Sequence, residues 1–298
     1  MTSVRKGRIV VFGDVIDDVV AVPDGSIRVD TDTPSMIRFR PGGSAANTAA
    51  WLGMLDCDVD FYGRVGAPDL HRHTQLLSDS GVRPFLSRDP ELPTGTIVIV
   101  VEGEQRTMLT DRGANDAFDP DEVSDETLEG ARLLHFTGYS LFGRAGAEPV
   151  KRLVSRARAK GVEVSVDPGS AGFLVDYGVD SFLDAVAGAS LIFPNYDEGA
   201  VLTGLTDPAE IAAALSQSFD VVVLTMGIGG VYVARTDRPA SHIPSLPSRV
   251  LDPTGAGDAF CAGFLDTWIT SGSTTRSARS GARVAARAVT VMGARPTF

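Results

Sequence analysis

A short glycine-rich segment near the C-terminus leads directly into a helical stretch. Gly255, Ala256 and Gly257 carry little or no side chain, so their backbone N–H groups are open where the helix begins. The first amides of a helix lack intrahelical partners and the helix dipole is positive there, which makes this a candidate anion site. Asp258 follows at once. A carboxylate beside a bound phosphate is useful when it takes the proton from a hydroxyl group that attacks phosphorus, so the segment predicts phosphoryl transfer with Asp258 as general base.

A second group of polar residues follows the first strand-like run of the chain. Asp14 and Asp18 come after that run, and ligands of open α/β sheets lie beyond the carboxyl ends of the strands. A carboxylate that accepts from vicinal hydroxyl groups is a common way to hold a sugar, because each bond is charge-assisted. Gly42 and Gly43 would let the backbone approach a sugar ring closely. Asn47 offers both a donor and an acceptor to hydroxyl groups, although it would also suit the cap of a helix.

Two motifs in this chain resemble the signatures of one enzyme family. The string Asp252-Pro-Thr-Gly-Ala-Gly-Asp258 followed by Ala-Phe resembles the C-terminal signature of the PfkB carbohydrate kinases, the ribokinase-like family. The string Pro41-Gly-Gly-Ser-Ala-Ala-Asn47-Thr-Ala resembles the N-terminal signature. Two signatures about 210 residues apart and in the expected order are a specific signal, and the resemblance extends over essentially the whole chain. It implies MgATP as phosphate donor and a sugar as acceptor, and its pattern favours Asp18 over Asp14 as the sugar-binding carboxylate.

The resemblance also implies nucleotide contacts. Thr225, Gly227 and Gly230 resemble the family's turn beside the ATP phosphates and ribose, although a glycine-rich β-turn would look the same. Asn195 and Glu198 resemble the family's Asn-x-x-Glu motif, which organises Mg²⁺ and its water molecules against the phosphates. The same pair fits a capping box with Asn195 as N-cap, and both interpretations can hold together.

A monovalent cation is a further implication of the resemblance, because many members bind one beside the anion site. The residues assigned to it here are Asp252, Thr254, Ala288, Val291, Gly293 and Thr297. Hard oxygen ligands on a closed loop would fit K⁺, so activation by K⁺ is a hypothesis.

Short β-branched runs alternate with amphipathic stretches along the chain. The strand-like runs are Ile9–Phe12, Val59–Tyr62, Leu133–Phe136, Val162–Val166, Leu191–Phe193 and Val221–Thr225. The helix-like stretches include Asn47–Leu55, Ala147–Lys160 and Gly257–Thr270. This alternation predicts an α/β fold with a mostly parallel central sheet and helices on both faces, and the resemblance implies the ribokinase-like form of it. No repeat or linker divides the chain, so we expect a single kinase domain over residues 1–298.

Residues 15–40 and 94–112 do not fit this alternation. Their strand-like pieces, such as the alternating Met36–Arg40, predict a small antiparallel sheet that stands off the main body. In the family that the chain resembles, segments at these places form a lid over the sugar site, and a phosphotransferase must keep water from the γ-phosphate. Arg112, beside this lid, is a further candidate for binding the acceptor. Lid-to-lid dimers occur in the family, and the face around Phe39 would suit a homodimer.

Composition limits the classes of partner. The net charge of −11 argues against nucleic acid or an anionic membrane surface. No Gly-x-x-x-x-Gly-Lys-Ser/Thr string occurs, which excludes a Walker-type P-loop, and no Gly-x-Gly-x-x-Gly string follows the first strand, which argues against a dinucleotide-dependent dehydrogenase. Two cysteines are too few for a disulfide scaffold and no apolar run is long enough to span a bilayer, so we expect a cytoplasmic protein.

The acceptor itself stays open. Asp18 and Asn47 fit a furanose such as ribose or fructose, but Ser44 stands where ribokinase has Lys. Tyr139 and Phe142 would supply an aromatic wall for a base, although core packing explains them as well. A nucleoside acceptor of the pseudouridine or adenosine type is therefore an alternative, and an aldonic acid is another. An alternative of a different class is a sensor that binds sugar or nucleotide without turnover, against which the intact phosphoryl-transfer residues speak.

Overall fold

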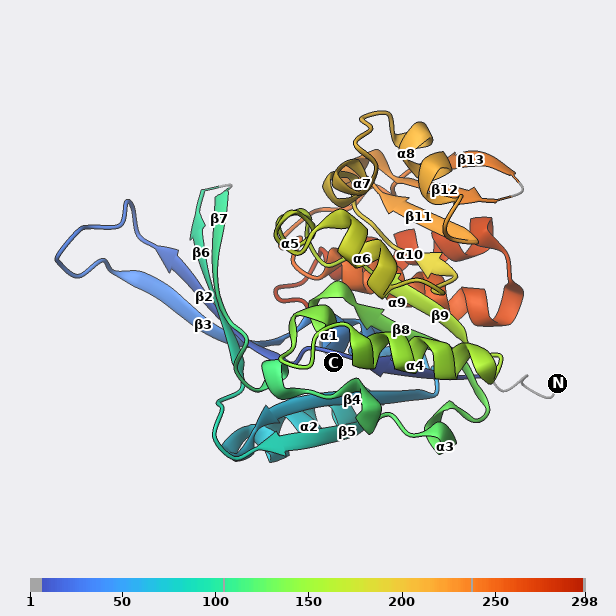
Figure 1. The fold of residues 1–298 in the computed structure, drawn as a ribbon. Helices are drawn as coiled ribbons and strands as arrows, with labels where there is room; N and C mark the ends of the chain where they lie inside the picture. The colour runs from blue at the N-terminus through green and yellow to red at the C-terminus, as the bar shows by residue number, and fades with distance from the viewer. Residues whose placement is uncertain (1–6, 104, 237, 297–298) are drawn as a thin grey trace.

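A nine-stranded sheet forms the centre of the protein in this computed structural model, which describes residues 7–103, 105–236 and 238–296 (Figure 1). The strand order is β13-β12-β11-β10-β9-β8-β1-β4-β5. Their bounds are β1 (Arg8–Phe12), β4 (Val59–Gly66), β5 (Arg83–Asp89), β8 (Ala131–Thr137), β9 (Glu163–Asp167), β10 (Leu191–Ile192), β11 (Val221–Thr225), β12 (Val231–Arg235) and β13 (Arg238–Ile243). Strands β5 to β11 in this order are parallel, and β12 and β13 add an antiparallel edge. The predicted mostly parallel sheet is confirmed.

Helices cover both faces of this sheet, as the alternation predicted. One face carries α1 (Ser44–Met54), α2 (Leu70–Asp79), α9 (Ala256–Ser271) and α10 (Thr274–Ala288). The other carries α3 (Asp125–Leu128), α4 (Glu148–Ala159), α5 (Ala171–Tyr177), α6 (Val179–Ala185), α7 (Tyr196–Thr203) and α8 (Pro208–Leu215). Because side chains alternate along a strand, Ile9 and Val11 of β1 enter the first core, and Val10 and Phe12 enter the second. Continuous apolar strands are thus buried on both sides.

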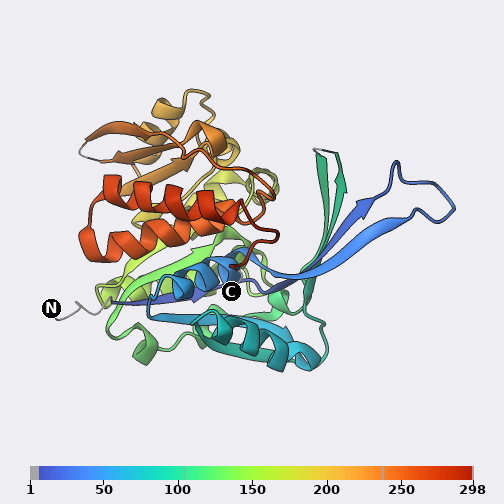
Figure 2. The ribbon, with the colours of Figure 1, turned by 180° about the vertical axis from the view of Figure 1, so that it is seen from behind.

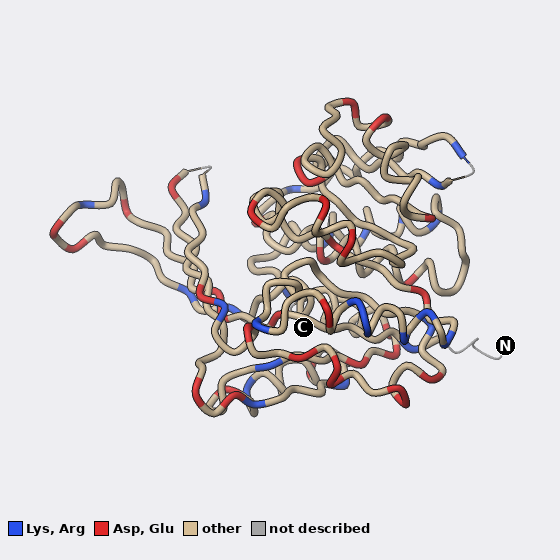
Figure 3. The backbone as a smooth tube through the Cα atoms, in the orientation of Figure 1, with Lys and Arg blue, Asp and Glu red and all other residues tan. Residues whose placement is uncertain are grey.

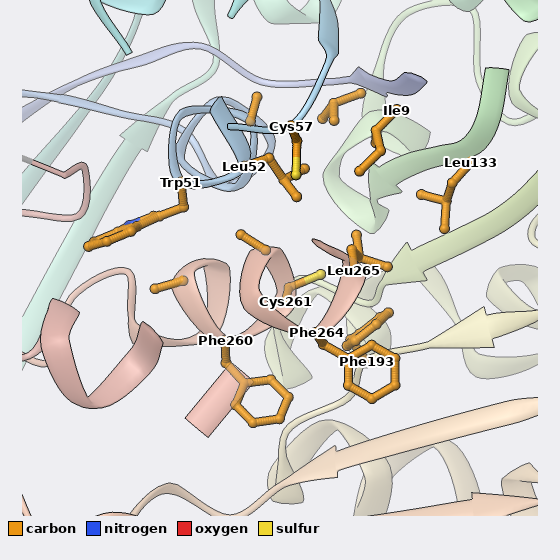
Figure 4. Packing of buried hydrophobic residues seen from close by; sticks show 14 of the residues in the cluster. Ile9, Trp51, Leu52, Cys57, Leu133, Phe193, Phe260, Cys261, Phe264 and Leu265 are labelled. Atoms are coloured by element: carbon orange, nitrogen blue, oxygen red, sulfur yellow. The ribbon is translucent and has the colours of Figure 1, made fainter. Parts of the chain in front are cut away.

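Helices α1 and α9 pack against each other, and this contact brings the two signature segments together. Trp51 and Leu52 of α1 lie in the same buried cluster as Cys261, Phe264 and Leu265 of α9 (Figure 4). All five side chains are buried. Each helix begins at its signature segment, so the apolar contact fixes the two helix N-termini relative to each other.

A second sheet of four strands projects from the body, where it forms the predicted lid (Figures 1 and 2). Its order is β3-β2-β6-β7, with β2 (Ile16–Pro23), β3 (Ser35–Gly42), β6 (Gly95–Glu102) and β7 (Gln105–Asp111). The pairs β2–β3 and β6–β7 are antiparallel as expected. The central pair β2–β6, which joins two hairpins from separate chain segments, is parallel, so the lid is mixed where a purely antiparallel sheet was predicted.

Cys57 and Cys261 both lie buried in the core. Across the part of the chain that the structure describes, every helix is too short or too polar to cross a membrane.

Candidate active site

The N-terminus of α9 has the open amides that the sequence predicted. Gly255 precedes the helix with φ of 74°, and a Cβ atom there would lie 2.6 Å from Ala294, so only glycine fits. Ala256 N donates to Pro253 O at 3.2 Å. Within the described residues no side chain caps this helix, so the following amides, beginning with that of Gly257, remain for an anion.

Asp258 lies in the first turn of α9 and is held by two side chains of α1. Ser44 Oγ donates to Asp258 Oδ1 at 2.7 Å, and Asn47 Nδ2 donates to Oδ2 at 2.9 Å. Burial raises the pKa of Asp258 to about 6, although both hydrogen bonds favour the charged form. A carboxyl group with this pKa suits a general base that works near neutral pH.

Asp14 supports the start of α1. Its carboxylate accepts from the backbone amides of Ser44 at 2.8 Å and Ala45 at 3.2 Å, and from Thr137 Oγ1 at 3.3 Å. A negative charge at this helix N-terminus is favourable because the first amides point at it. The predicted contact of Asp14 with an acceptor would have to use the acceptor capacity of Oδ2 that these three bonds leave.

Asp18 lies on the lid strand β2, close to the two glycines that precede α1. A Cβ atom on Gly42 would lie 2.3 Å from Asp18 Oδ2, so the carboxylate occupies the space that this glycine leaves free. Gly43 has φ of 91°, and its Cβ would lie 2.5 Å from the carbonyl oxygen of Asp14. Burial, reinforced by the charge of Asp14, raises the pKa of Asp18 to about 7, and Arg295 opposes this shift.

Arg295 belongs to the site, and the sequence analysis did not select it. It is 6% exposed, and it donates from Nε to Asn47 Oδ1 at 3.2 Å and from Nη2 to Gly42 O at 2.7 Å. Asn47 therefore links Arg295 to Asp258 through the two ends of its amide. The available signal was an arginine embedded in the small-residue string Gly293-Ala294-Arg295-Pro296, which is an unusual place for a solvated charge.

Asn195 and Glu198 form the capping box at the start of α7. Asn195 Oδ1 accepts from Glu198 N at 2.9 Å, and the Glu198 carboxylate accepts from Asn195 N at 2.8 Å and Nδ2 at 2.7 Å. Burial raises the pKa of Glu198 to about 7. Asp167, which the sequence analysis did not name, lies nearby at the end of β9, and burial with the Glu198 charge raises its pKa strongly. The rule applied to Asp18, a carboxylate after a strand, would have found it.

Two adjoining pockets connect these groups. The residues of the first pocket surround Asp258 and are Ser44, Asp167, Gly169, Phe193, Asn195, Glu198, Thr225, Gly257, Asp258 and Phe260. The second pocket is mainly apolar, and the predicted Thr225, Gly227 and Gly230 contribute to its wall with Ala256 and Gly257. Thr225, Gly257 and Phe260 line both pockets. The apolar pocket is therefore continuous with the pocket that contains the carboxylates of Asp167, Glu198 and Asp258, and the two meet at the N-terminus of α9.

The predicted cation ligands lie on two neighbouring segments. The Asp252 carboxylate accepts from Thr254 N at 3.0 Å, Thr254 Oγ1 at 2.6 Å and Gly293 N at 3.0 Å. Arg106 of the lid strand β7 reaches the same place, with Nη2 at 3.2 Å from Asp252 Oδ1 and Nη1 at 2.6 Å from Thr254 Oγ1. Protein donors thus crowd Oδ1, whereas Oδ2 accepts from Gly293 N, so a cation here would use Oδ2 with carbonyl oxygens or replace Arg106.

The remaining predicted cation ligands lie at the end of α10 and in the segment after it. Ala288 O accepts from Val291 N at 3.2 Å, which closes a turn before Gly293. Thr297 lies outside the described residues.

Arg112 is engaged with neighbours of its own. It donates from Nε to Asp116 Oδ1 at 2.5 Å and from Nη2 to Tyr139 O at 3.0 Å, and its guanidinium lies 5.5 Å from the centre of the Phe142 ring. Phe142 packs at 4.2 Å from Phe173 and stays 39% exposed. Figure 3 shows charged positions of both signs gathered where the lid joins the body, and Arg112 with Asp116 follows the last lid strand.

Comparison with known proteins gives relatives over most of the chain. The bifunctional protein HldE of Pseudomonas putida is 30% identical over 274 residues, which cover 87% of this chain and 55% of that protein. HldE of Shewanella baltica is 31% identical over 276 residues with the same coverage. The chain thus spans about half the length of these curated relatives.

Solved structures share the fold. An adenosine kinase from Sinorhizobium meliloti has a TM-score of 0.87 at 24% identity and covers 98% of this chain and 97% of its own. A ribokinase from Thermotoga maritima has a TM-score of 0.81 at 21% identity, with 97% and 94% covered. A protein of E. coli assigned as a ribokinase II, solved with ATP and Mg²⁺, has a TM-score of 0.85 at 21% identity, with 97% and 94% covered. The predicted ribokinase-like fold is confirmed.

The family itself follows from the sequence as a whole. The model described as pfkB family carbohydrate kinase matches residues 6–298. That match includes both signature segments and the lid. As the two signatures predicted, the chain belongs to the pfkB family of carbohydrate kinases.

Proposed function

We propose that this protein transfers the γ-phosphoryl group of MgATP to a hydroxyl group of a sugar-like acceptor. The observation that carries the proposal is the position of Asp258. Its carboxyl group lies in one pocket with the first turn of α9, where open amides favour an anion. Asp258 takes the proton of the attacking hydroxyl group, and the open amides of the Gly255–Asp258 segment, beginning with that of Gly257, stabilise charge on the transferred group.

The apolar pocket beside α9 is the proposed nucleotide site. Thr225, Gly227 and Gly230 line it, and Ala256 and Gly257 at its inner end belong to the anion loop. An adenine base would be buried against apolar side chains while its phosphates extend toward the α9 amides. The E. coli neighbour solved with ATP and Mg²⁺ supports this choice of donor.

The carboxylates around the first pocket fit Mg²⁺. Asp167 and Glu198 are hard oxygen ligands on its wall, and Mg²⁺ keeps several water molecules when it is held by one or two carboxylates. Bound Mg²⁺ would neutralise charge on the phosphates. Asn195 keeps the Glu198 carboxylate in place through two hydrogen bonds, so that this side chain is already oriented before the ligand arrives.

Asp18, Gly42, Gly43 and Asn47 are the proposed contacts of a furanose such as ribose or fructose, under the lid. A nucleoside is the second candidate acceptor, and the half-exposed Phe142 ring beside Arg112 favours it, because a base would stack there. An aldonic acid would instead need Arg112 to leave Asp116.

The direct test measures ADP release from MgATP in potassium buffer with ribose, fructose, 2-keto-3-deoxygluconate, adenosine and pseudouridine. We expect one acceptor class to turn over and Asp258→Asn to abolish that turnover while ATP still binds, as measured by calorimetry. Retained activity in Asp258→Asn would disprove the base. Binding of ATP and of an acceptor without any turnover would instead support a sensor.

Three further proposals concern a cation, the extent of the kinase unit and a partner. We propose that K⁺ activates the protein by binding to the carbonyl oxygens near Asp252 and Gly293. Equal rates of ADP release in sodium and potassium buffers would contradict this proposal. We also propose that residues 1–298 act as one cytoplasmic kinase unit and that the exposed Phe39 face of the lid joins two copies. Sedimentation of the protein and of Phe39→Ser tests the dimer, which that variant should dissociate.

A further inference from the structure

Arg295 is a buried cation that the proposed transfer mechanism leaves without a role. Its side chain is nine-tenths buried, and the desolvation lowers its pKa to about 10. Two of its nitrogens are bonded, to Asn47 and Gly42, and Nη1 has no partner in the described part of the chain. Burying a guanidinium costs free energy unless hydrogen bonds and opposite charges compensate for its lost hydration, so its position requires a physical explanation.

The hydrogen bonds of Arg295 decide how Asn47 points. An amide side chain can be turned over, which exchanges its oxygen with its NH₂ group. Because Arg295 only donates, it requires the oxygen Oδ1 on its side, and this turns Nδ2 toward Asp258 Oδ2. The bond to Gly42 O holds the backbone that leaves room for the Asp18 carboxylate. One guanidinium thus sets the orientation on both sides of the acceptor site.

The charges around the site are mostly negative. The titratable groups around Asp258 are Asp14 after β1, Asp18 on β2, Asp167 on β9, Glu198 on α7, Cys261 on α9 and Arg295 in the C-terminal segment. Asp17 also faces Asp18, but Arg72 binds it through two hydrogen bonds at 2.8 and 2.6 Å. Among the described titratable groups around Asp258, Arg295 supplies the positive charge.

We propose that Arg295 is a positioning residue for phosphoryl transfer: it orients Asn47 toward Asp258, fixes Gly42 beside Asp18, and supplies the positive charge that both carboxylates face. This inference rests on the proposed function for its kinetic consequences. Its electrostatic and orientational parts concern the protein without an acceptor.

The test compares Arg295→Gln, which removes the charge, with Arg295→Lys, which keeps the charge but has no planar fork. Carbon-13 labelling of aspartate Cγ reports the pKa of Asp258, with Asp258→Asn to assign its signal. We expect the pKa of Asp258 to rise by about one unit in Arg295→Gln and to stay near its wild-type value in Arg295→Lys. Arg283→Gln, an exposed arginine of α10, is the matched control and should shift nothing.

Kinetics with the panel acceptor that turns over fastest separate geometry from charge. Both Arg295 variants should lose kcat by about 100-fold, because neither can hold Asn47 and Gly42 at once, while the KM for MgATP stays within about twofold. Circular dichroism and MgATP binding verify that the variants fold. A wild-type pKa of Asp258 in Arg295→Gln, or a wild-type kcat in Arg295→Lys, would overturn the proposal. If no acceptor turns over, the proposed function fails, and the labelled aspartates still decide the role of Arg295.

Discussion

Asp258 has to lose its proton before it can serve as the base, and its surroundings make that loss pH-dependent in a useful range. Burial places its pKa near 6, so the ionised form dominates at pH 7 and becomes scarce below pH 6. We expect kcat to fall about tenfold per pH unit below about pH 6. As the pH is lowered, Asp18, with a pKa near 7, is protonated before Asp258. We therefore expect the KM for the acceptor to start rising at a higher pH than the pH at which kcat starts to fall. Initial rates between pH 5 and 9 measure both limbs; a flat kcat down to pH 5 would contradict Asp258 as base.

Gly42 gives a second prediction at the level of one atom. Its backbone is not in the left-handed region, so Gly42→Ala introduces a Cβ atom without backbone strain, 2.3 Å from the Asp18 carboxylate. The carboxylate must move, and we expect the acceptor KM to rise at least about tenfold as a charge-assisted hydrogen bond is lost. The KM for MgATP should hold. Gly172→Ala, whose Cβ meets open space, is the control. An unchanged acceptor KM would show that Asp18 does not bind the acceptor.

The residues that the sequence revealed and those that it did not differ in one physical respect. Asp258 and Asn47 each lie in a short local string with the glycines that precede them. Residue type and spacing within these strings therefore carried the prediction. Arg295 acts on Asn47 from 248 residues away. A lone arginine has no periodicity or spacing that names its partner. Only the tertiary fold brings the two together, where Trp51 Nε1 of α1 donates to Ala294 O, next to Arg295, at 2.9 Å.

At the scale of elements, the lid is tied to the anion loop by Arg106. Strand β7 otherwise exposes all its side chains, and the bonds from Arg106 to Asp252 and Thr254 join it to the segment before α9. Because β7 pairs with β6 and β6 with β2, this contact also helps to hold Asp18 over the site. A lid closed by a few contacts is expected to open and close during turnover.

Removing this contact should loosen the lid. We expect Arg106→Ala to raise the acceptor KM by about fivefold, the effect of a partly exposed ion pair of about 1 kcal/mol. High salt should bring the wild type closer to the variant, since such a pair is screened. Arg38→Ala is the control, because Arg38 lies on the lid strand β3 and, among the residues that the structure describes, donates to the neighbouring Ile37 O alone. Equal acceptor KM values in both variants would show that Arg106 does not hold the lid.

Elements were predicted well where pattern alone decides them. Buried β-branched runs and amphipathic stretches gave the parallel strands other than β5, and the helices α1, α4 and α9, within a few residues. The edge hairpin β12–β13 and the parallel pairing of β2 with β6 were not predicted. Pairing depends on which segments meet in space, and the exposed strand β3 has almost no buried side chains whose pattern would indicate its neighbour.

For the whole molecule, the site concentrates buried carboxyl groups in a chain that is already acidic. The pKa values of Asp18, Asp258, Glu198 and Asp167 are all raised, with burial as the first cause. Between their unfolded values near 4 and their folded values, the native state holds more protons than the unfolded chain. The contribution of these groups to the free energy of unfolding therefore falls as pH rises through this window. The net charge of −11 acts in the same direction, because protonation relieves repulsion.

Thermal unfolding should therefore show a maximum in stability near pH 5 rather than pH 7.5. Asp252 and Asp69 have lowered pKa values, so their contribution is complete above about pH 4 and limits stability only in more acidic solution. We expect Asp18→Asn to raise the melting temperature at pH 7.5 by about 2 °C or more and to flatten its dependence between pH 5 and 7.5. Asp32→Asn, which removes an exposed charge, should leave the slope unchanged. Equal effects of the two variants, measured by circular dichroism, would mean that net charge and not the buried site sets the pH dependence.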